Sequence, residues 1–289
     1  MKAKRVLAMA VTAITAAVCI GASVQAPATA ATKYKLLWSQ EFNNTKVARP
    51  DPKVWDYDLT DGYGWGNSEQ EYYTNSGRNV RIDGKGHLTI TALRLSDTDP
   101  ILDHCYACTY TSARLKTAKL IGFRYGRMVA RMKLPTDVGT WPAFWMLGAS
   151  LVKGGTWPES GEMDIVETRG TAPNMVQGTV HGPGYSAGNA VGSGYYAPNP
   201  VSNGYHTYGI DWLPNKIVFT FDGHVYFTVT PADVRGNRYV FNQEFFLILN
   251  LAMGGEFAGD TDPAVKTSVM NVDWIRYYSI NGQGKVYKH

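Results

Sequence analysis

Short apolar runs with alternating polarity follow one another along most of the chain, and this pattern is typical of β-strands. Glycine and proline fall mostly between the runs, and no helical period longer than two turns and no internal repeat is found. The clearest candidate strands are residues 88–92, 128–134, 217–221, 225–230, 245–253 and 272–278. Asp222-Gly223 between two of them is a strong hairpin signal. The sequence therefore predicts an all-β fold, most economically a β-sandwich.

Residues 1–30 have the pattern of a secretory signal peptide. Three basic residues precede an apolar run over residues 6–22, and Ala28-Thr29-Ala30 offers a cleavage site. A single membrane anchor is the alternative, but the run is rich in alanine and interrupted by threonines, which favours export with cleavage. We therefore expect a secreted, extracellular protein.

The remaining chain is expected to be one folded domain, residues 31–280, with a short C-terminal tail, residues 281–289. Removal of the leader takes away three of the 28 basic residues and no acidic residue, which leaves 25 basic against 24 acidic side chains. This balance indicates neither nucleic acid nor an anionic membrane as a partner. A monomer is the default expectation.

Cys105 and Cys108 are the only cysteines after the leader, spaced C-x-x-C. In an exported chain a local disulfide is the leading interpretation, with free thiols as the alternative. Two thiolates are too few for a structural zinc site, and a redox motif would need a βαβ context that the chain lacks.

The most informative segment is the acidic stretch of residues 162–167, Glu-Met-Asp-Ile-Val-Glu. Side chains on a strand alternate between faces, so Glu162 and Asp164 share one face, whereas a regular strand would send Glu167 to the other. A β-bulge, most simply at Val166, returns Glu167 to the acidic face. Crowded carboxylates raise at least one pKa, so one acid can stay protonated while another is ionised.

Two carboxyl groups that differ in protonation are what cleavage of a glycosidic bond requires. Glu162 and Glu167 on one bulged strand favour the short separation of a retaining mechanism over the wider inverting one. An acidic surface strand or a calcium site is the alternative. A solvated acidic face would not normally lie between Trp157-Pro158 and an apolar alternation, which favours catalysis.

Aromatic residues before the acidic strand indicate a sugar ligand. Trp141 and Trp145 are four positions apart and share a face, with Phe144 turned to the core. Indole stacks on sugar C–H faces and carries an N–H donor, although buried tryptophans are also ordinary core residues. The glycine-rich loop of residues 62–67 adds the amide of Asn67. The segment from Gly182 to Asn203 could be a flexible connection, but Tyr185, Tyr195 and Tyr196 favour a loop bordering the site.

Over nearly its whole mature length, the chain resembles glycoside hydrolase family 16, and specifically its laminarinase-like endo-β-1,3-glucanase branch. The motifs that carry the resemblance are Leu37–Phe42, Gly64–Asn67, Glu71–Thr74, Thr111–Leu115, Tyr125–Arg127, Trp141–Leu147, Trp157–Glu167 and Val180–Gly184. The six-residue E-x-D-x-x-E form is the bulged version of the family's acidic motif. One departure is that Gly254-Gly255 is followed by Glu256-Phe257-Ala258 where relatives often have Trp-Pro.

The resemblance implies a jelly-roll β-sandwich of two curved antiparallel sheets with an open concave cleft. It implies Glu162 as nucleophile, Glu167 as general acid/base and Asp164 as the assisting carboxylate. Substrate contacts are expected from Asn67, Arg114, Trp141, Trp145, Trp157 and His181. Arg114 could instead form a structural ion pair, and His181 could be a satisfied strand histidine.

No cofactor is expected for catalysis, but the resemblance implies one structural calcium ion. Its expected ligands are Glu41, the backbone carbonyl of Gly86 and Asp273, and oxygen-only ligation suits calcium. The ion would join the first and last strands.

The expected partner is a polysaccharide, cut at internal β-1,3 linkages of a laminarin-type β-glucan, with a mixed β-1,3/1,4-glucan as a further candidate. One alternative is a non-catalytic β-glucan-binding protein. The other keeps the hydrolase chemistry and changes the polymer to a galactan such as agarose, carrageenan or β-1,3-galactan.

Overall fold

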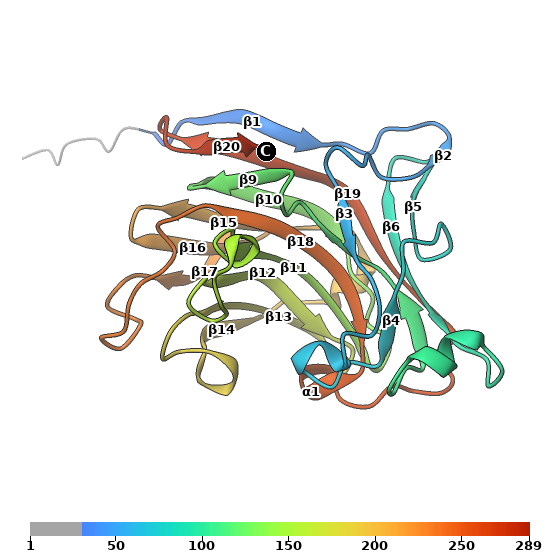
Figure 1. The fold of residues 1–289 in the computed structure, drawn as a ribbon. Helices are drawn as coiled ribbons and strands as arrows, with labels where there is room; N and C mark the ends of the chain where they lie inside the picture. The colour runs from blue at the N-terminus through green and yellow to red at the C-terminus, as the bar shows by residue number, and fades with distance from the viewer. Residues whose placement is uncertain (1–30) are drawn as a thin grey trace, which may run out of the picture. The chain divides into compact units, whose positions relative to one another are not determined.

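Two large β-sheets pack face to face and contain nearly half of the residues that a computed structural model of the chain describes, residues 31–289 (Figure 1). The expected signal peptide, residues 1–30, lies outside the described part. Thr32–His289 form one unit. Within it, no helix is long and apolar enough to cross a membrane.

The first sheet, sheet A, has 11 strands, with β10 and β19 at its centre. In spatial order its main strands are β17 (His224–Val229), β16 (Lys216–Phe221), β15 (His206–Leu213), β10 (Gly126–Lys133), β19 (Thr267–Ile280), β6 (Leu88–Arg94), β5 (Val80–Asp83) and β2 (Val47–Ala48). The strands β1 (Tyr34–Gln40), β7 (Tyr110–Ser112) and β4 (Glu71–Tyr73) pair with β19, β6 and β7 respectively.

The second sheet, sheet B, has nine strands, with β11 and β18 at its centre. In spatial order its main strands are β14 (Val191–Tyr196), β13 (Ala172–His181), β12 (Glu162–Arg169), β11 (Thr140–Gly148), β18 (Phe245–Met253), β8 (Arg114–Lys116) and β3 (Asp56–Asp58). The strand β9 (Ile121–Arg124) pairs with β18 and with β20 (Lys285–Lys288).

Helical structure among the described residues is confined to short turns. They are α1 (Gly255–Ala258) and the 3-10 helices η1 (Gly64–Gly66), η2 (Pro100–His104), η3 (Leu151–Lys153), η4 (Ala187–Asn189) and η5 (Val201–Asn203). The all-β prediction is therefore confirmed, and the curved two-sheet sandwich is the expected jelly-roll (Figure 1).

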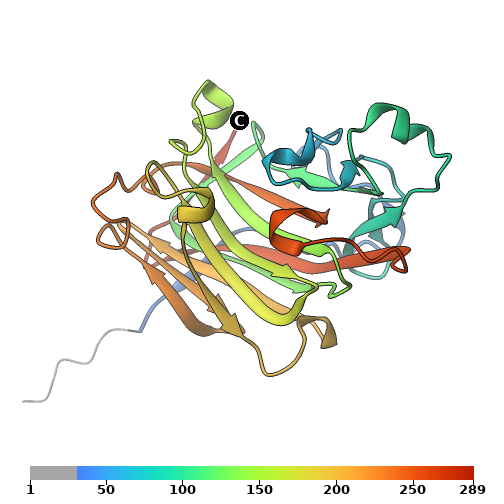
Figure 2. The same ribbon diagram turned by 90° about the horizontal axis from the view of Figure 1, so that it is seen from below.

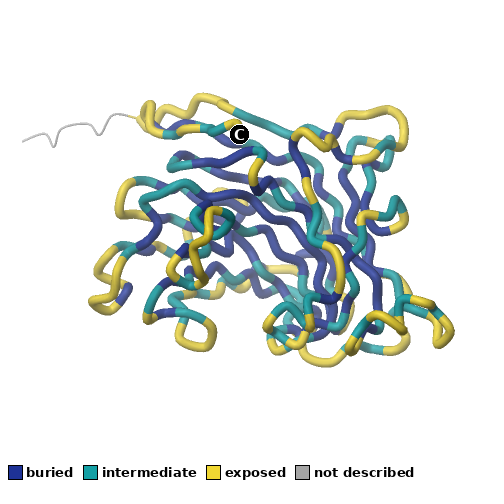
Figure 3. Tube along the Cα trace, in the orientation of Figure 1, coloured by how far each residue is buried: buried dark blue, intermediate teal, exposed yellow. Residues whose placement is uncertain are grey.

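The core lies between the sheets, where the middle strands are buried along most of their length (Figure 3). Alternate residues of sheet B, such as Phe144, Met163 and Leu249, pack there with Ile210 and Tyr277 of sheet A. Burying each such side chain contributes about 1.5–3 kcal/mol. Because one face of β11, β12 and β18 is committed to this core, their other residues must point to the opposite face of sheet B.

Several sequence predictions match the strands closely. The run at residues 245–253 is β18, buried throughout and flanked by β11 and β8. The hairpin at Asp222-Gly223 joins β16 and β17, and both turn residues have positive φ, at 47° and 77°. Such a turn twists with the strands and favours glycine at its second position.

The two sheets are antiparallel as expected, apart from the short parallel pair β4 and β7. Two other expectations about the fold were wrong in detail. Residues 281–289 are not a tail outside the domain, because β20 pairs with β9 inside sheet B. The stretch from Gly182 to Asn203 is not all loop, because β14 extends the edge of sheet B beside β13. Its Tyr185, expected near the site, is fully buried and donates to the carbonyl of Arg238.

Candidate active site

The acidic strand β12 carries the expected bulge. Asp164 pairs with Thr179 and Glu167 pairs with Gln177, so two residues of β12, Ile165 and Val166, stand where β13 has one. Both bulge residues are buried in the apolar core. The extra residue shifts the alternation by one position, and Glu167 thereby returns to the side of Asp164.

Strand register then defines the surface that we call the acidic face, the side of sheet B opposite the core. Residues directly opposite each other on antiparallel strands share a face. On β11, Leu147 pairs with Glu162, Trp145 with Asp164 and Ala143 with Glu167. Because Trp141 has the same parity, both expected tryptophans lie on the acidic face with the three carboxylates, and so does His181, opposite Glu162.

Glu162 lies at the start of β12 and is partly accessible. The indole Nε1 of Trp157, a residue that is 43% exposed, donates a hydrogen bond of 2.6 Å to Glu162 Oε2. Burial, reinforced by the neighbouring Asp164 charge, raises the pKa of Glu162 to about 8, against the opposing effect of His181 and the Trp157 donor.

Glu167 has a separate indole donor. Trp141 Nε1 donates to Glu167 Oε1 at 2.8 Å. Burial raises the pKa of Glu167 to about 7, while the Trp141 hydrogen bond lowers it by favouring the charged form. A carboxyl with this pKa can carry a proton near neutrality and release it during turnover.

Asp164 lies between the two glutamates and is almost completely buried. His181 Nε2 lies 3.0 Å from Asp164 Oδ2, while His181 Nδ1 accepts the backbone N–H of Ala187 at 3.2 Å. A neutral His181 therefore carries its proton on Nε2, toward Asp164. Burial and the Glu167 charge raise the pKa of Asp164 well above its usual range, so the three acids hold at least one proton near neutral pH.

Arg114 is placed by packing and charge together. Its guanidinium lies 4.7 Å from the ring centroids of both Trp65 and Trp145, and its Nε lies 2.9 Å from Asp58 Oδ2. The structural ion pair considered for Arg114 is therefore present. Arg114 also stacks on Trp145 and so holds that side chain beside the acids. Trp145 Nε1 donates a hydrogen bond of 2.7 Å to Asn250 Oδ1.

The chain after β18 builds one wall of the site from Glu256 and Phe257. Helix α1 lies next to η1 (Figure 2), and the backbone N–H of Glu256 donates to the carbonyl of Asn67. Phe257 packs against Trp141 with 5.1 Å between ring centroids. The Asn67 side chain donates to Glu69 Oε1 at 3.1 Å. Phe257 therefore supports Trp141, and Glu256 is bonded to the backbone of the Asn67 loop.

Comparison with known proteins agrees with this geometry. The family model described as "Glycosyl hydrolases family 16" matches residues 67–276, which include all three acids. The chain belongs to glycoside hydrolase family 16. The "Beta-glucanase" of Rhodothermus marinus is 36% identical over 255 residues, covering 85% of each chain. The "Glucan endo-1,3-beta-glucosidase A1" of Niallia circulans is 37% identical over 264 residues, and this match covers 84% of the present chain but only 37% of that longer protein.

Solved structures of the family have the same architecture. The X-ray structure of the endo-β-1,3-glucanase from Pyrococcus furiosus superposes with a TM-score of 0.77 at 38% identity, covering 86% of this chain and 95% of the other. This family 16 chain is thus a glycoside hydrolase with the jelly-roll fold.

Of the residues expected to bind calcium, Asp273 lies on β19, Glu41 directly follows β1, and Gly86 lies in the bend between β5 and β6. The pairs Gln40–Ile275 and Leu88–Val272 bring the regions of Glu41, Gly86 and Asp273 toward one another. Glu41, however, accepts hydrogen bonds of 3.0 and 2.8 Å from Arg276, and Asp273 pairs with Arg131. Arginine already compensates both carboxylates, so the donor set as it stands does not fit a calcium ion. Calcium binding stays a prediction from the resemblance.

Cys105 and Cys108 are joined by a disulfide, with 5.7 Å between their Cα atoms. The bridge closes a turn that is attached to the rest of the fold by Asp61, whose Oδ2 accepts the backbone N–H of Tyr106 at 2.8 Å.

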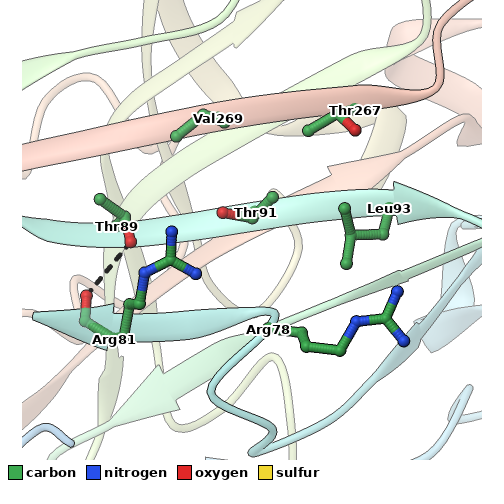
Figure 4. A pocket seen from close by; sticks show the side chains of 7 residues that line it. All are labelled: Arg78, Arg81, Thr89, Thr91, Leu93, Thr267 and Val269. Atoms are coloured by element: carbon green, nitrogen blue, oxygen red, sulfur yellow. Dashed lines mark hydrogen bonds between the residues drawn. The ribbon is translucent and has the colours of Figure 1, made fainter. Parts of the chain in front are cut away.

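An open groove on sheet A lies away from this chemistry (Figure 4). It holds none of the expected site residues and is lined by threonine, aliphatic and arginine side chains. These are Arg78, Arg81, Thr89, Thr91, Leu93, Thr267 and Val269.

Sequence reasoning missed two polar residues that support the site, Asn250 and Glu69. Asn250 is the one polar residue in the nine-residue run of β18, and it is 5% exposed. A lone amide in an otherwise apolar buried strand was the signal that could have found it, because a buried amide needs hydrogen-bond partners.

Proposed function

We propose that this family 16 chain is a secreted, retaining endo-β-1,3-glucanase that acts on laminarin-type β-glucan, including mixed β-1,3/1,4-glucan. The observation that supports it best is the bulge in β12, which puts Glu162 and Glu167 on one face with an indole donor for each. The names of the Niallia and Pyrococcus proteins support the β-1,3 linkage. The leader pattern of residues 1–30 supports secretion.

The proposed reaction has two displacement steps. Glu162 attacks the anomeric carbon as the bond to the leaving oxygen breaks, and Glu167 gives that oxygen its proton. The product of this step is a glycosyl ester of Glu162. Glu167, now a carboxylate, takes a proton from water, and the water oxygen displaces Glu162 from the anomeric carbon. Both carboxyl groups end in their starting protonation states.

The reaction starts with Glu162 ionised and Glu167 protonated, and a proton on Asp164 favours this state although the three acids are close together. Ionised Glu162 is stabilised by the Trp157 N–H, whereas an ionised Asp164 raises the pKa of Glu162. A proton on Asp164 removes that repulsion and so favours ionised Glu162. When the ester forms, Glu162 loses its charge, and a proton on Asp164 is no longer needed to reduce repulsion between the two residues. The His181 N–H beside Asp164 then favours an ionised Asp164.

The acidic face suits a neutral sugar better than a sulfated galactan. Among the described residues, the cation that stacks on Trp145 is Arg114, which also stacks on Trp65. Arg114 is already paired with Asp58, so its charge is not free to bind a sulfate group. Indole rings with a polar edge fit the C–H faces and hydroxyls of glucose.

Digestion of laminarin by the mature protein tests the proposal, with agarose, carrageenan and mixed-linkage glucan in parallel. An endo-acting enzyme releases a ladder of oligosaccharides early, and proton NMR shows the β-anomer before mutarotation if configuration is retained. Binding without new reducing ends would identify a glucan-binding protein instead. First appearance of the α-anomer would exclude the double displacement.

Trp141→Phe is expected to move to higher pH the limb of the kcat/KM profile that reports Glu167. The active form needs a proton on Glu167, and the Trp141 N–H lowers the pKa of Glu167 by favouring its charged form. Without the donor the pKa rises, by about one to two units for a bond worth roughly 1.5–3 kcal/mol. A pH profile of laminarin hydrolysis measures this, with Trp145→Phe as the matched control because the Trp145 N–H goes to Asn250. A limb that moves equally in both variants would contradict the assignment.

A further inference from the structure

Beneath the acidic face, a chain of hydrogen bonds joins two expected substrate contacts to one buried carboxylate. Trp145 Nε1 donates to Asn250 Oδ1 at 2.7 Å, Asn250 Nδ2 donates to Tyr73 Oη at 3.1 Å, and Tyr73 Oη lies 3.2 Å from Glu69 Oε2. The other Glu69 oxygen accepts the Asn67 amide at 3.1 Å.

The direction of every bond in this chain is fixed. Indole N–H is only a donor, so the oxygen of Asn250 must face Trp145 and its NH₂ must face Tyr73. The Tyr73 hydroxyl accepts from Asn250, and its single proton is then directed to Glu69. The amide of Asn67 reaches the second oxygen of Glu69 through its nitrogen. Both oxygens of Glu69 therefore act as acceptors, as they do in a carboxylate.

The surroundings keep that chain rigid. Tyr73 is fully buried, Asn250 is 5% exposed and Glu69 is 8% exposed, so water does not readily replace a lost partner. Trp65 packs on Tyr73 and on Arg114, and Arg114 also stacks on Trp145. Neighbouring Glu71 is also fully buried, and its Oε1 has no hydrogen-bond partner. Burial, with the adjacent Glu69 carboxylate, raises the pKa of Glu71 well above its usual range, which favours the neutral form of Glu71.

We propose that Glu69 is a positioning residue of the active site, which holds Asn67 directly and Trp145 through Tyr73 and Asn250. One carboxylate thereby sets the orientation of two side chains that come from η1 and β11, far apart in sequence. The proposal rests on the proposed glucan hydrolysis for its functional consequence, but the hydrogen-bond chain can be tested without substrate.

The substrate-free test is the NMR signal of the Trp145 indole N–H, assigned by its disappearance in Trp145→Phe. Glu69→Gln replaces one acceptor oxygen by NH₂, and Tyr73→Phe removes the hydroxyl that joins Asn250 to Glu69. Both variants are expected to shift the Trp145 indole resonance and to speed its exchange with solvent. An unchanged resonance in a folded Tyr73→Phe would overturn the proposal, even if Glu69→Gln does not fold.

Kinetics provide the second readout. Glu69→Gln and Tyr73→Phe are each expected to raise KM for laminarin about tenfold, the effect of one lost hydrogen bond to a charged group, with a smaller change in kcat. Adding Trp145→Phe to Tyr73→Phe should cost less than the two single effects multiplied, because both cut the same chain. The matched control is Glu244→Gln, which removes a carboxylate paired with Lys153 and His289 outside the acidic face and should leave both constants unchanged.

The outcomes separate the two proposals. An inactive wild-type protein whose Trp145 resonance responds to Tyr73→Phe would overturn the glucanase and support the positioning role of Glu69 in the structure. An active wild type with unaltered KM in both variants, or with multiplicative effects of Tyr73→Phe and Trp145→Phe, would overturn the positioning role alone.

Discussion

Glu162→Gln is expected to abolish laminarin hydrolysis, by about 10⁴-fold or more, while the protein stays folded and binds glucan. An amide cannot form the glycosyl ester, but it has the shape of the carboxylate and its oxygen still accepts the Trp157 N–H. The change also removes a charge next to buried Asp164, whose repulsion contributes to the raised pKa of Glu162. The melting temperature should therefore be unchanged or higher.

Three measurements check this result: reducing-sugar release, laminarin affinity by calorimetry, and thermal unfolding. Glu159→Gln is the matched control, because Glu159 lies three residues before Glu162 and its one side-chain hydrogen bond among residues 31–289 is accepted from Thr156. It should keep wild-type activity. A Glu162→Gln protein that releases sugar at the wild-type rate would remove Glu162 from the chemistry, and one that no longer binds laminarin would show a role in affinity instead.

The parts of the fold that sequence predicted well are those in which local pattern and burial agree. The run at residues 245–253 is apolar because β18 is covered on both sides, and the turn at Asp222-Gly223 is set by its own backbone preferences. The bulge in β12 could be predicted because catalysis requires the three acids to share one face, and a regular strand would place Glu167 on the other. Its core-facing residues, Ile165 and Val166, are as apolar as that requires.

The features that sequence missed depend on pairing between distant segments. Nothing local marks Lys285–Lys288 as a strand, which forms because β9 offers it a free edge. The same holds for β14, whose glycines and tyrosines are typical of a loop but pair with β13. From the sequence, Tyr185 likewise resembles a residue that contacts a ligand. In the structure it is buried, and its hydroxyl donates to the carbonyl of Arg238.

The residues that support the site could not be predicted for a related reason. Asn67 and Trp145 were recognised individually, but the carboxylate that joins them, Glu69, is connected through Tyr73 and Asn250 on two further strands. Such a connection is a property of register, and register is set by the whole sheet.

Glu167→Gln is expected to separate the two chemical steps. Laminarin hydrolysis should fall by about 10²–10⁴-fold, because its sugar leaving group needs the proton of Glu167. A substrate with a good leaving group, such as an aryl β-laminaribioside, does not need that proton, so Glu162 should still form the ester. Release should then be slow, because no base activates water, and the first turnover should appear as a burst of the aryl alcohol.

Azide distinguishes this role from that of Glu162. Azide is an anion that needs no general base, so it should speed release from Glu167→Gln and give a glycosyl azide with the β configuration of the substrate. In Glu162→Gln the ester cannot form, so a substrate with a good leaving group should not restore activity. Glu162→Ala removes the carboxylate, and azide in the space that it leaves would give the α product. If the β-azide came from Glu162→Gln and the α-azide from Glu167→Ala, the two glutamates would have to exchange roles, and the raised pKa of Glu162, about 8, would then mark the acid.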